Sequence, residues 1–127
     1  MGKYVDGYVL PILKDKVEEY RKIASEAGKI WKKHGALQYF ECIGDDLTPD
    51  MGMGDMKIVQ FPTITNAGPD ETVVFAFVVF KSKEHRDEVN KKVMTDPYMT
   101  DPSMKDKTMP FDATKMVYGG FNVIVEE

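Results

Sequence analysis

The 127-residue chain has a single cysteine, Cys42, so it cannot form an internal disulfide bond. One free thiol is typical of proteins that stay in a reducing compartment. The chain also lacks any run of about 18 apolar residues, the length that a membrane-crossing helix needs. Its first residues alternate as a strand does and lack the continuous apolar stretch of a signal peptide. We therefore expect a cytoplasmic protein with no membrane partner.

Basic residues are not in excess either. The 17 lysines and arginines are outnumbered by 21 aspartates and glutamates, which gives a net charge of −4 at pH 7. The lysines are scattered among acids, whereas a nucleic-acid-binding protein concentrates basic charge on one face, so we expect no nucleic-acid partner. The two histidines, His34 and His85, lack the spacing of a metal-binding pair. We expect no metal and no other cofactor.

The apolar residues that are present recur with helix and strand periods. An apolar stripe at spacings of three and four residues predicts a helix over Asp15–His34. Ser82 is a favourable N-cap for a second helix that ends near Thr95. Alternating segments predict strands at Lys3–Leu10, Ala36–Ile43, Thr72–Phe80 and Lys115–Val125, with a short extra strand at Lys57–Phe61.

Local signals predict where these elements begin, bend and end. Asp15 followed by Glu18 resembles a capping box at the start of the first helix, and Gly35 suits a left-handed stop after it. Pro11 should end the first strand, because it has no N–H to donate to a ladder. The pair Gly119–Gly120 predicts a bulge or a bend in the last strand.

The order β-α-β-β-α-β is that of the ferredoxin-like α+β fold, in which helices cover one face of an antiparallel sheet. The strand Thr72–Phe80 is apolar on both of its faces. One face carries Val73, Phe75, Phe77 and Val79, and the other carries Val74, Ala76, Val78 and Phe80. Two helices cannot cover both faces, so we expect a second copy of the chain to cover the other one. The chain is then one domain over residues 1–127 that forms a homodimer.

Asp6 is the first candidate for a functional site, because it lies inside an apolar strand on the same face as Tyr4 and Tyr8. An ionised carboxylate there needs a partner or solvent, since desolvation disfavours its charge. Asp6 could act as a general base or as a substrate anchor. It could equally be a structural carboxylate that is bonded to a turn or to a partner subunit.

The predicted ligand site contains four further residues, which are Tyr8, Glu41, Arg86 and Tyr118. Arg86 could bind an anionic substrate through a bidentate pair, or its helix could have a structural role in which Asp87 or Asn90 fixes it to the segment Pro97–Pro110. Tyr118 could donate a hydrogen bond to a ligand, or it could be an ordinary strand tyrosine. Glu41 and Cys42 should point to opposite faces of their strand and, without a bulge, should not line one pocket. We expect Cys42 to be a small buried residue.

Four segments together form a recognisable pattern. They are YVDGYV at Tyr4–Val9, HGAL…ECxxDD at His34–Asp46, SKExRDxxNKKVMxDPxM at Ser82–Met99 and MPFDxxxMxYGGF at Met109–Phe121. This pattern resembles the YbaA-like proteins, domain-of-unknown-function family 1428. The chain departs from the family at Lys81, where proline is expected, and at Phe77, where tryptophan is common. The resemblance implies the dimeric α/β-barrel superfamily, in which two ferredoxin-like subunits pack their sheets into one barrel.

Fold does not select a function within this superfamily, which includes cofactor-free monooxygenases, haem enzymes and lactone isomerases. The first hypothesis is a protein that binds a small molecule at the residues named above. The second is a cofactor-independent monooxygenase or isomerase, in which Asp6 abstracts a proton and Tyr118 or Arg86 holds the developing oxyanion. The third is a structural dimer without a ligand. A cavity lined by Asp6 and Tyr118 would favour the first two hypotheses.

Overall fold

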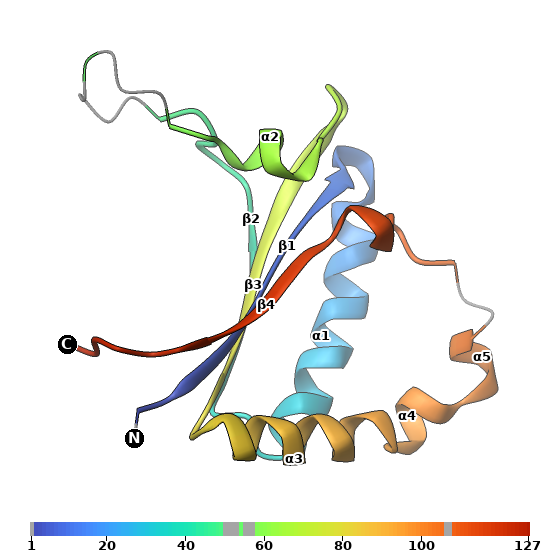
Figure 1. The fold of residues 1–127 in the computed structure, drawn as a ribbon. Helices are drawn as coiled ribbons and strands as arrows, with labels where there is room; N and C mark the ends of the chain where they lie inside the picture. The colour runs from blue at the N-terminus through green and yellow to red at the C-terminus, as the bar shows by residue number, and fades with distance from the viewer. Residues whose placement is uncertain (1, 50–53, 55–57, 106–107) are drawn as a thin grey trace.

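Four antiparallel strands form one sheet in the computed structural model, which describes residues 2–49, 54, 58–105 and 108–127 (Figure 1). The strands lie in the order β2-β3-β1-β4, and every neighbouring pair is antiparallel. Their bounds are Tyr4–Leu13 for β1, Gln38–Ile43 for β2, Glu71–Phe80 for β3 and Val117–Asn122 for β4. This is an α+β fold, as predicted, and its strand order is consistent with the ferredoxin-like arrangement.

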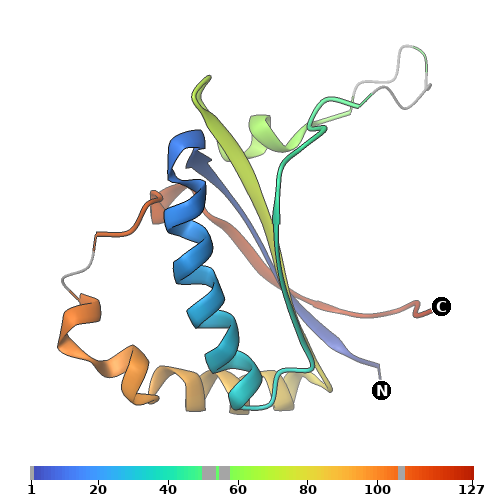
Figure 2. The ribbon, with the colours of Figure 1, turned by 180° about the vertical axis from the view of Figure 1, so that it is seen from behind.

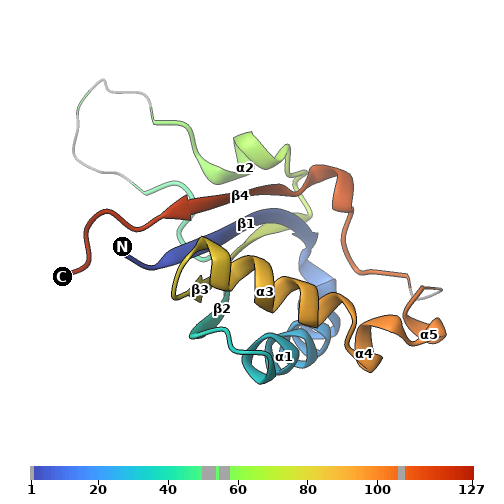
Figure 3. The ribbon, with the colours of Figure 1, turned by 60° about the horizontal axis from the view of Figure 1, so that its bottom comes forward.

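The helices are unequally divided between the two faces of the sheet. Figures 2 and 3 show α1 and α3 against one face and the short α2 against the other, near one end of the strands. The bounds are Val17–Lys33 for α1, Phe61–Thr65 for α2, Lys83–Met94 for α3, Pro97–Thr100 for α4 and Pro102–Lys105 for α5. Within the described part of the chain, no helix is both long enough and apolar enough to cross a membrane.

The face that α1 and α3 cover contains the hydrophobic core. Tyr4, Val78 and Phe80 from the sheet are buried against Val89 and Val93 of α3. A second buried cluster contains Leu10, Ile12, Val74 and Ala76, from the middle and far end of β1 and β3. These residues follow the two-residue period of β1 and β3, and each fully buried large apolar side chain contributes roughly 1.5–3 kcal/mol.

The opposite face of the sheet is apolar and partly open: Val9, Val73 and Val79 are buried on it, whereas several of its phenylalanines are exposed. Phe40 of β2 stacks on Phe77 of β3 at a centroid distance of 5.0 Å, yet Phe40 is 44% exposed. Phe75 of β3 and Phe121 of β4 belong to the same face and are 43% and 61% exposed. The helix α2 reaches one end of this face, where Phe61 lies 6.1 Å from the Phe75 ring. One chain therefore leaves this face partly uncovered, as predicted, and its cover by a second copy stays a prediction.

Pro11 does not end the first strand, contrary to the prediction. It pairs with Val73 of β3, and β1 continues to Leu13. The Lys14 N–H points to β3, where it donates to the Asp70 carbonyl oxygen, so the backbone groups of odd-numbered β1 residues point to β4. Pairing with β4 stops at Val9. The missing N–H of Pro11 therefore faces the side on which the ladder has already ended, and it costs no hydrogen bond.

The predicted start of the first helix was wrong, whereas the Ser82 cap and the Gly35 stop are confirmed. A 3₁₀ turn at Lys14–Lys16 precedes α1, so Asp15 lies within this turn and not at the N-cap. Ser82 caps α3 by accepting a hydrogen bond from the His85 N–H at 3.0 Å, and α3 ends before Thr95. Gly35 follows α1 with a φ of 115°, which favours glycine.

The prediction of a short extra strand at 57–61 was also wrong for the four of these residues that the structure describes. Lys57 lies outside the described residues, and Phe61 begins the helix α2 instead. Pro62 occupies the first turn of α2, where its fixed φ favours a helix and its missing N–H costs nothing. Asn66 ends α2 in the left-handed conformation at a φ of 53°.

The last strand is regular, so the predicted bulge at Gly119–Gly120 was wrong. Gly119 pairs with Gly7 and Gly120 pairs with Asp6, residue for residue. A side chain at position 120 would collide with the Tyr4 hydroxyl group, which explains glycine there by space and not by a bend. The strand ends at Asn122, before the predicted Val125, because its partner β1 begins at Tyr4.

Candidate functional site

Asp6 is fully buried on the helix-covered face of β1, with an exposed fraction of 0%. Its Oδ1 atom accepts a hydrogen bond from Arg86 Nη1 at 2.9 Å, whereas Oδ2 has no hydrogen-bond partner among the described residues. Burial raises the pKa of the Asp6 carboxyl group, against the opposing charge of Arg86. Asn90 lies close enough to favour the ionised form too, although its position falls short of a hydrogen bond to Asp6.

Arg86 of α3 joins Asp6 to the edge strand β4. Besides Asp6, its Nη1 atom donates to the Tyr118 hydroxyl oxygen at 3.2 Å, and its Nε atom donates to Asp87 Oδ1 at 2.8 Å. The guanidinium carbon lies 4.9 Å from the centroid of the Tyr4 ring, a cation–π distance. Arg86 therefore neutralises a buried acid and fixes α3 against two strands.

Tyr8 and Tyr118 complete this cluster. Their rings stack at a centroid distance of 4.7 Å, as expected for residues that pair directly across β1 and β4. Burial raises the pKa of the Tyr8 hydroxyl group, so it stays protonated at neutral pH. The structure thus brings together four residues of the predicted ligand site, which are Asp6, Tyr8, Arg86 and Tyr118.

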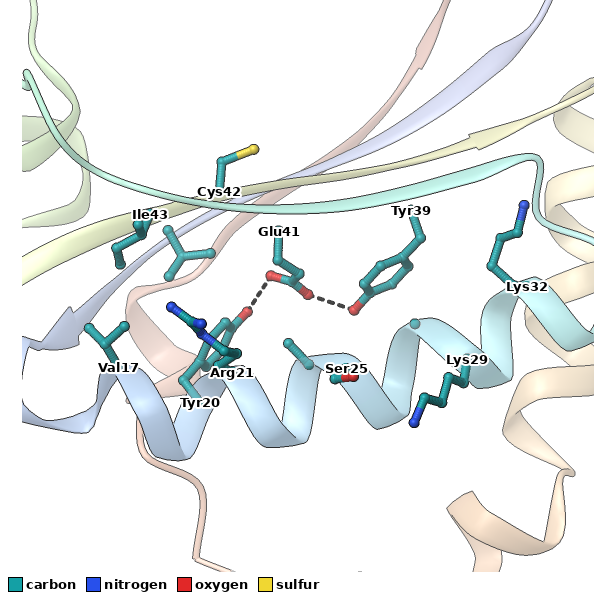
Figure 4. Close-up of a pocket in the computed structure, with 13 residues that line it drawn as sticks. Val17, Tyr20, Arg21, Ser25, Lys29, Lys32, Tyr39, Glu41, Cys42 and Ile43 are labelled. Carbon is teal, nitrogen blue, oxygen red and sulfur yellow. Dashed lines mark hydrogen bonds between the residues drawn. The ribbon is translucent and has the colours of Figure 1, made fainter.

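Glu41, the fifth predicted residue, belongs to a different cluster. Its Oε1 atom accepts a hydrogen bond from the Tyr20 hydroxyl at 2.6 Å, and its Oε2 atom accepts one from the Tyr39 hydroxyl at 2.5 Å (Figure 4). Burial, together with the Glu41 charge, raises the pKa of both tyrosine hydroxyls, so both remain hydrogen-bond donors. Each carboxylate oxygen is therefore held by a neutral donor from a different element.

Two neighbouring pockets lie between α1 and the sheet, and both touch the Glu41 cluster. The outer pocket, of about 540 Å³, is bordered by α1 and the edge strand β2 (Figure 4). The inner pocket, of about 220 Å³, lies deeper, against Leu10, Ala76 and Val78 of the sheet, with Met99, Met109, Phe111 and Met116 on its other side. The residues common to both pockets are Tyr20, Ala24, Tyr39 and Glu41.

The pockets divide the predicted site residues. Tyr8 and Glu41 line the inner pocket, whereas Asp6, Arg86 and Tyr118 lie outside both pockets. The Tyr8 ring, which stacks on Tyr118, therefore connects the buried ion pair with the inner pocket.

Cys42 is exposed, contrary to the prediction of a small buried residue. Its side chain leaves β2 on the side opposite to Glu41, as the strand period requires (Figure 4). Both residues nevertheless border the outer pocket, because β2 is an edge strand whose backbone is open to it. The prediction that they could not share a pocket was therefore wrong.

Sequence reasoning missed three residues of the site, which are Tyr20, Trp31 and Tyr39. Tyr20 and Trp31 belong to the apolar stripe that predicted the first helix, and both pack against the core, so the stripe gave no sign of a role in a site. Trp31 Nε1 donates to Asn90 Oδ1 at 3.1 Å. Tyr39 carries the one available signal, because it lies two residues before Glu41 and so shares its face of the strand.

His34 and Asp96 form a separate polar contact at the end of α1. His34 Nε2 lies 2.7 Å from Asp96 Oδ2, and Lys33 Nζ lies 3.2 Å from the same oxygen. Asp96 Oδ1 accepts the Tyr98 N–H at 2.8 Å and caps α4. The hydrogen bond from His34, with those from Tyr98 and Lys33, lowers the pKa of Asp96 to about 2. These contacts join α1 to α4, so we assign them a structural role.

The fold and these clusters define an α+β protein with polar groups buried between its sheet and its helices. Residues 3–113 match the family model described as "Protein of unknown function (DUF1428)", and the chain belongs to this family. The chain is 39% identical over 125 residues to "Uncharacterized protein YbaA" of Escherichia coli (strain K12), a match that covers 98% of this chain and 99% of that protein. The protein of the same name from Shigella flexneri matches to the same extent. The family resemblance is thereby confirmed.

Proposed function

We propose that the chain is a cytoplasmic protein that binds a small molecule in the inner pocket, beside Glu41. The observation that supports this most directly is a carboxylate held by two tyrosine hydroxyls at the wall of an otherwise apolar cavity. Ligand sites are typically apolar cavities with a small number of convergent polar groups. The apolar walls give affinity, and the polar groups fix the orientation of the ligand. The cavity is smaller than the roughly 300–1,000 Å³ usual for drug-sized ligands. It therefore suits a small molecule or one end of a larger one.

Binding is favoured over catalysis by the position of Asp6. The monooxygenase or isomerase hypothesis needs Asp6 to touch a substrate, but Asp6 lies outside both pockets and bonds to Arg86. A buried carboxylate with a cationic partner is a common structural element. We infer that Asp6 and Arg86 hold Tyr8 and Tyr118 in place beside the pocket, and that Glu41 contacts the ligand.

The open face of the sheet supports a homodimer. Phe40, Phe75 and Phe121 are each at least 43% exposed on one contiguous face. Stable interfaces bury about 800 Å² on each partner, and a four-stranded apolar face is of suitable size. We propose that two copies pack these faces together as a dimeric barrel, which leaves the inner pocket of each subunit on the outside of the paired sheets.

A thermal-shift screen against a library of small metabolites tests the proposed binding site. A compound that binds the folded state raises the apparent melting temperature, and the rise grows with the logarithm of its concentration over Kd. The variant Ala27→Leu adds volume at the α1 wall of the inner pocket and should abolish the shift. Ala113→Leu, at an exposed position outside both pockets, is the matched control. A library without any stabilising compound, or a shift that survives Ala27→Leu, would exclude this site.

A further inference from the structure

The inner pocket has aromatic walls and a single charged side chain. Five of its lining residues are aromatic, namely Tyr8, Tyr20, Trp31, Tyr39 and Phe111. Among the described residues that line it, Glu41 is the one with a formal charge, and none is lysine, arginine or histidine. The faces of aromatic rings attract cations through their quadrupole, and a carboxylate attracts them through its charge. The aromatic rings and the carboxylate therefore both favour a positively charged ligand.

The Glu41 charge is not neutralised by a cationic side chain in the described part of the chain, where no ion pair includes it. Arg86, the cation on the far side of Tyr8, is already paired with Asp6 and Asp87. Three cations, Arg21, Lys29 and Lys32, border the outer pocket but not the inner one. Arg21 pairs with Glu18 at 3.3 Å, Lys29 pairs with Glu26 at 3.4 Å, and Lys32 donates to the Leu37 carbonyl oxygen at 2.8 Å. A half-buried carboxylate without a counter-ion disfavours an anionic ligand and gains from a cationic one.

The rings are held in place before any ligand arrives. The Tyr20 and Tyr39 hydroxyls are both bonded to Glu41, and Trp31 Nε1 is bonded to Asn90 at 3.1 Å. Tyr8 is stacked on Tyr118. A site whose side chains are already fixed loses little conformational entropy on binding, so weak cation–π contacts can produce measurable affinity.

The acceptors in the pocket distinguish a methylated ammonium group from a bare one. A primary ammonium group carries three N–H donors that all need acceptors once they are desolvated. Each Glu41 oxygen already accepts one tyrosine hydroxyl and so retains only part of its acceptor capacity, and the thioethers of Met99, Met109 and Met116 are weak acceptors. Methyl groups on nitrogen need no acceptor and pack well against rings and thioethers.

We propose that the inner pocket binds a quaternary or otherwise methylated ammonium group, with the aromatic side chains as its cage and Glu41 as its counter-ion. This inference rests on the proposed function, because it names the class of ligand for the same pocket. With a volume of about 220 Å³, the pocket would hold the methylated head of such a ligand. Any longer substituent would extend past Glu41 towards the outer pocket, since both pockets share that wall.

Calorimetric titration with choline tests this inference, with dimethylbutanol as the reference ligand. Dimethylbutanol has the shape of choline, but a carbon atom replaces the ammonium nitrogen, so the pair differs in charge alone. We expect choline to bind the unmodified protein roughly tenfold or more tightly than dimethylbutanol. In Glu41→Gln, which keeps a hydrogen-bond acceptor for the tyrosines, choline affinity should fall by about tenfold and dimethylbutanol affinity should stay unchanged.

Equal affinity for the two compounds, or choline affinity that Glu41→Gln leaves intact, would overturn the cationic ligand class. Failure of choline to bind the unmodified protein at millimolar concentration would overturn it too. The proposed function would survive these results if another compound from the metabolite screen lost its effect in Ala27→Leu. The comparison of choline with dimethylbutanol needs no variant, so the test remains decisive even if Glu41→Gln does not fold.

Discussion

At the residue scale, the buried carboxylate of Asp6 and the half-buried carboxylate of Glu41 are stabilised in different ways. Asp6 is ion-paired with Arg86 and has one oxygen without a partner among the residues that the structure describes, whereas Glu41 is held by two neutral hydroxyl groups. Charge compensation at Asp6 makes that residue suitable for holding elements together. The absence of an ion pair at Glu41, among the described residues, leaves a charge available to a ligand.

Arg86→Leu should destabilise the fold strongly, because it leaves the Asp6 carboxylate buried without its partner. Removing one member of a buried ion pair typically costs about 3–5 kcal/mol. Asp6 has a raised pKa in the folded state, so its contribution to stability is present below its unfolded pKa and is lost as pH rises through its folded pKa. Without Arg86 the folded pKa rises further. The deficit of the variant should therefore grow from pH 5 to pH 8, as measured by urea unfolding.

Arg21→Leu is the matched control for this measurement. Arg21 pairs with Glu18 on the surface of α1, with an exposed side chain. Exposed pairs of this kind contribute about 0–1 kcal/mol. Similar losses for the two variants, or a deficit of Arg86→Leu that does not change with pH, would contradict the assignment of Asp6 and Arg86 as a buried pair.

At the scale of single elements, β4 depends on a close approach between its backbone and β1. A Cβ atom on Gly120 would collide with the Tyr4 side chain, whereas one on Gly119 would meet Phe121 at 3.6 Å, an ordinary contact distance. Gly120→Ala should thus cost about 1–3 kcal/mol through overpacking. Gly119→Ala should change the free energy of unfolding by about 0.5 kcal/mol or less.

Thermal or urea unfolding of the two glycine variants side by side checks this prediction. The two positions are adjacent on the same strand, so any general effect of alanine on β4 appears in both variants. Equal stability of Gly120→Ala and Gly119→Ala would mean that the contact with Tyr4 does not determine the residue at position 120.

The elements that could be predicted are those that depend on neighbouring residues in the sequence. The Ser82 cap and the long strand β3 follow from side-chain chemistry and period within a few residues. The effect of Pro11 could not be predicted, because it depends on where β4 stops along β1. The role of Gly120 likewise depends on Tyr4, which is more than a hundred residues away in the chain. Tertiary neighbours decide both positions.

The candidate site likewise has one part that the sequence predicts and another that depends on tertiary packing. The register of β1 and β4 places Tyr8 opposite Tyr118, and the single acid on an apolar strand identified Asp6. The pockets could not be predicted, since their walls combine α1, three strands and the side chains of Met99, Met109, Phe111 and Met116. The strand period alone could have associated Tyr39 with Glu41, but the Tyr20 hydroxyl reaches Glu41 through the packing of α1 on β2.

At the scale of the whole molecule, the uncovered face of the sheet leads us to expect a dimer. Phe75→Asp places a charge at an exposed position on this face and should convert a dimer at micromolar concentration into a monomer. Sedimentation velocity measures the change. Met94→Asp is the control, because Met94 is 55% exposed at the end of α3 and belongs to the helix side of the molecule. An unmodified protein that sediments as a monomer at this concentration would exclude the proposed dimer.

Trp31 offers the most direct test of the inner pocket as the ligand site, because it is the one tryptophan of the chain and it lines that pocket. Titration of a ligand from the screen, or of choline, should change the Trp31 emission saturably, with the Kd that calorimetry gives. The change should be absent in Ala27→Leu and present in Ala113→Leu. A ligand that binds by calorimetry yet leaves the Trp31 emission unaltered would show that binding occurs elsewhere on the molecule.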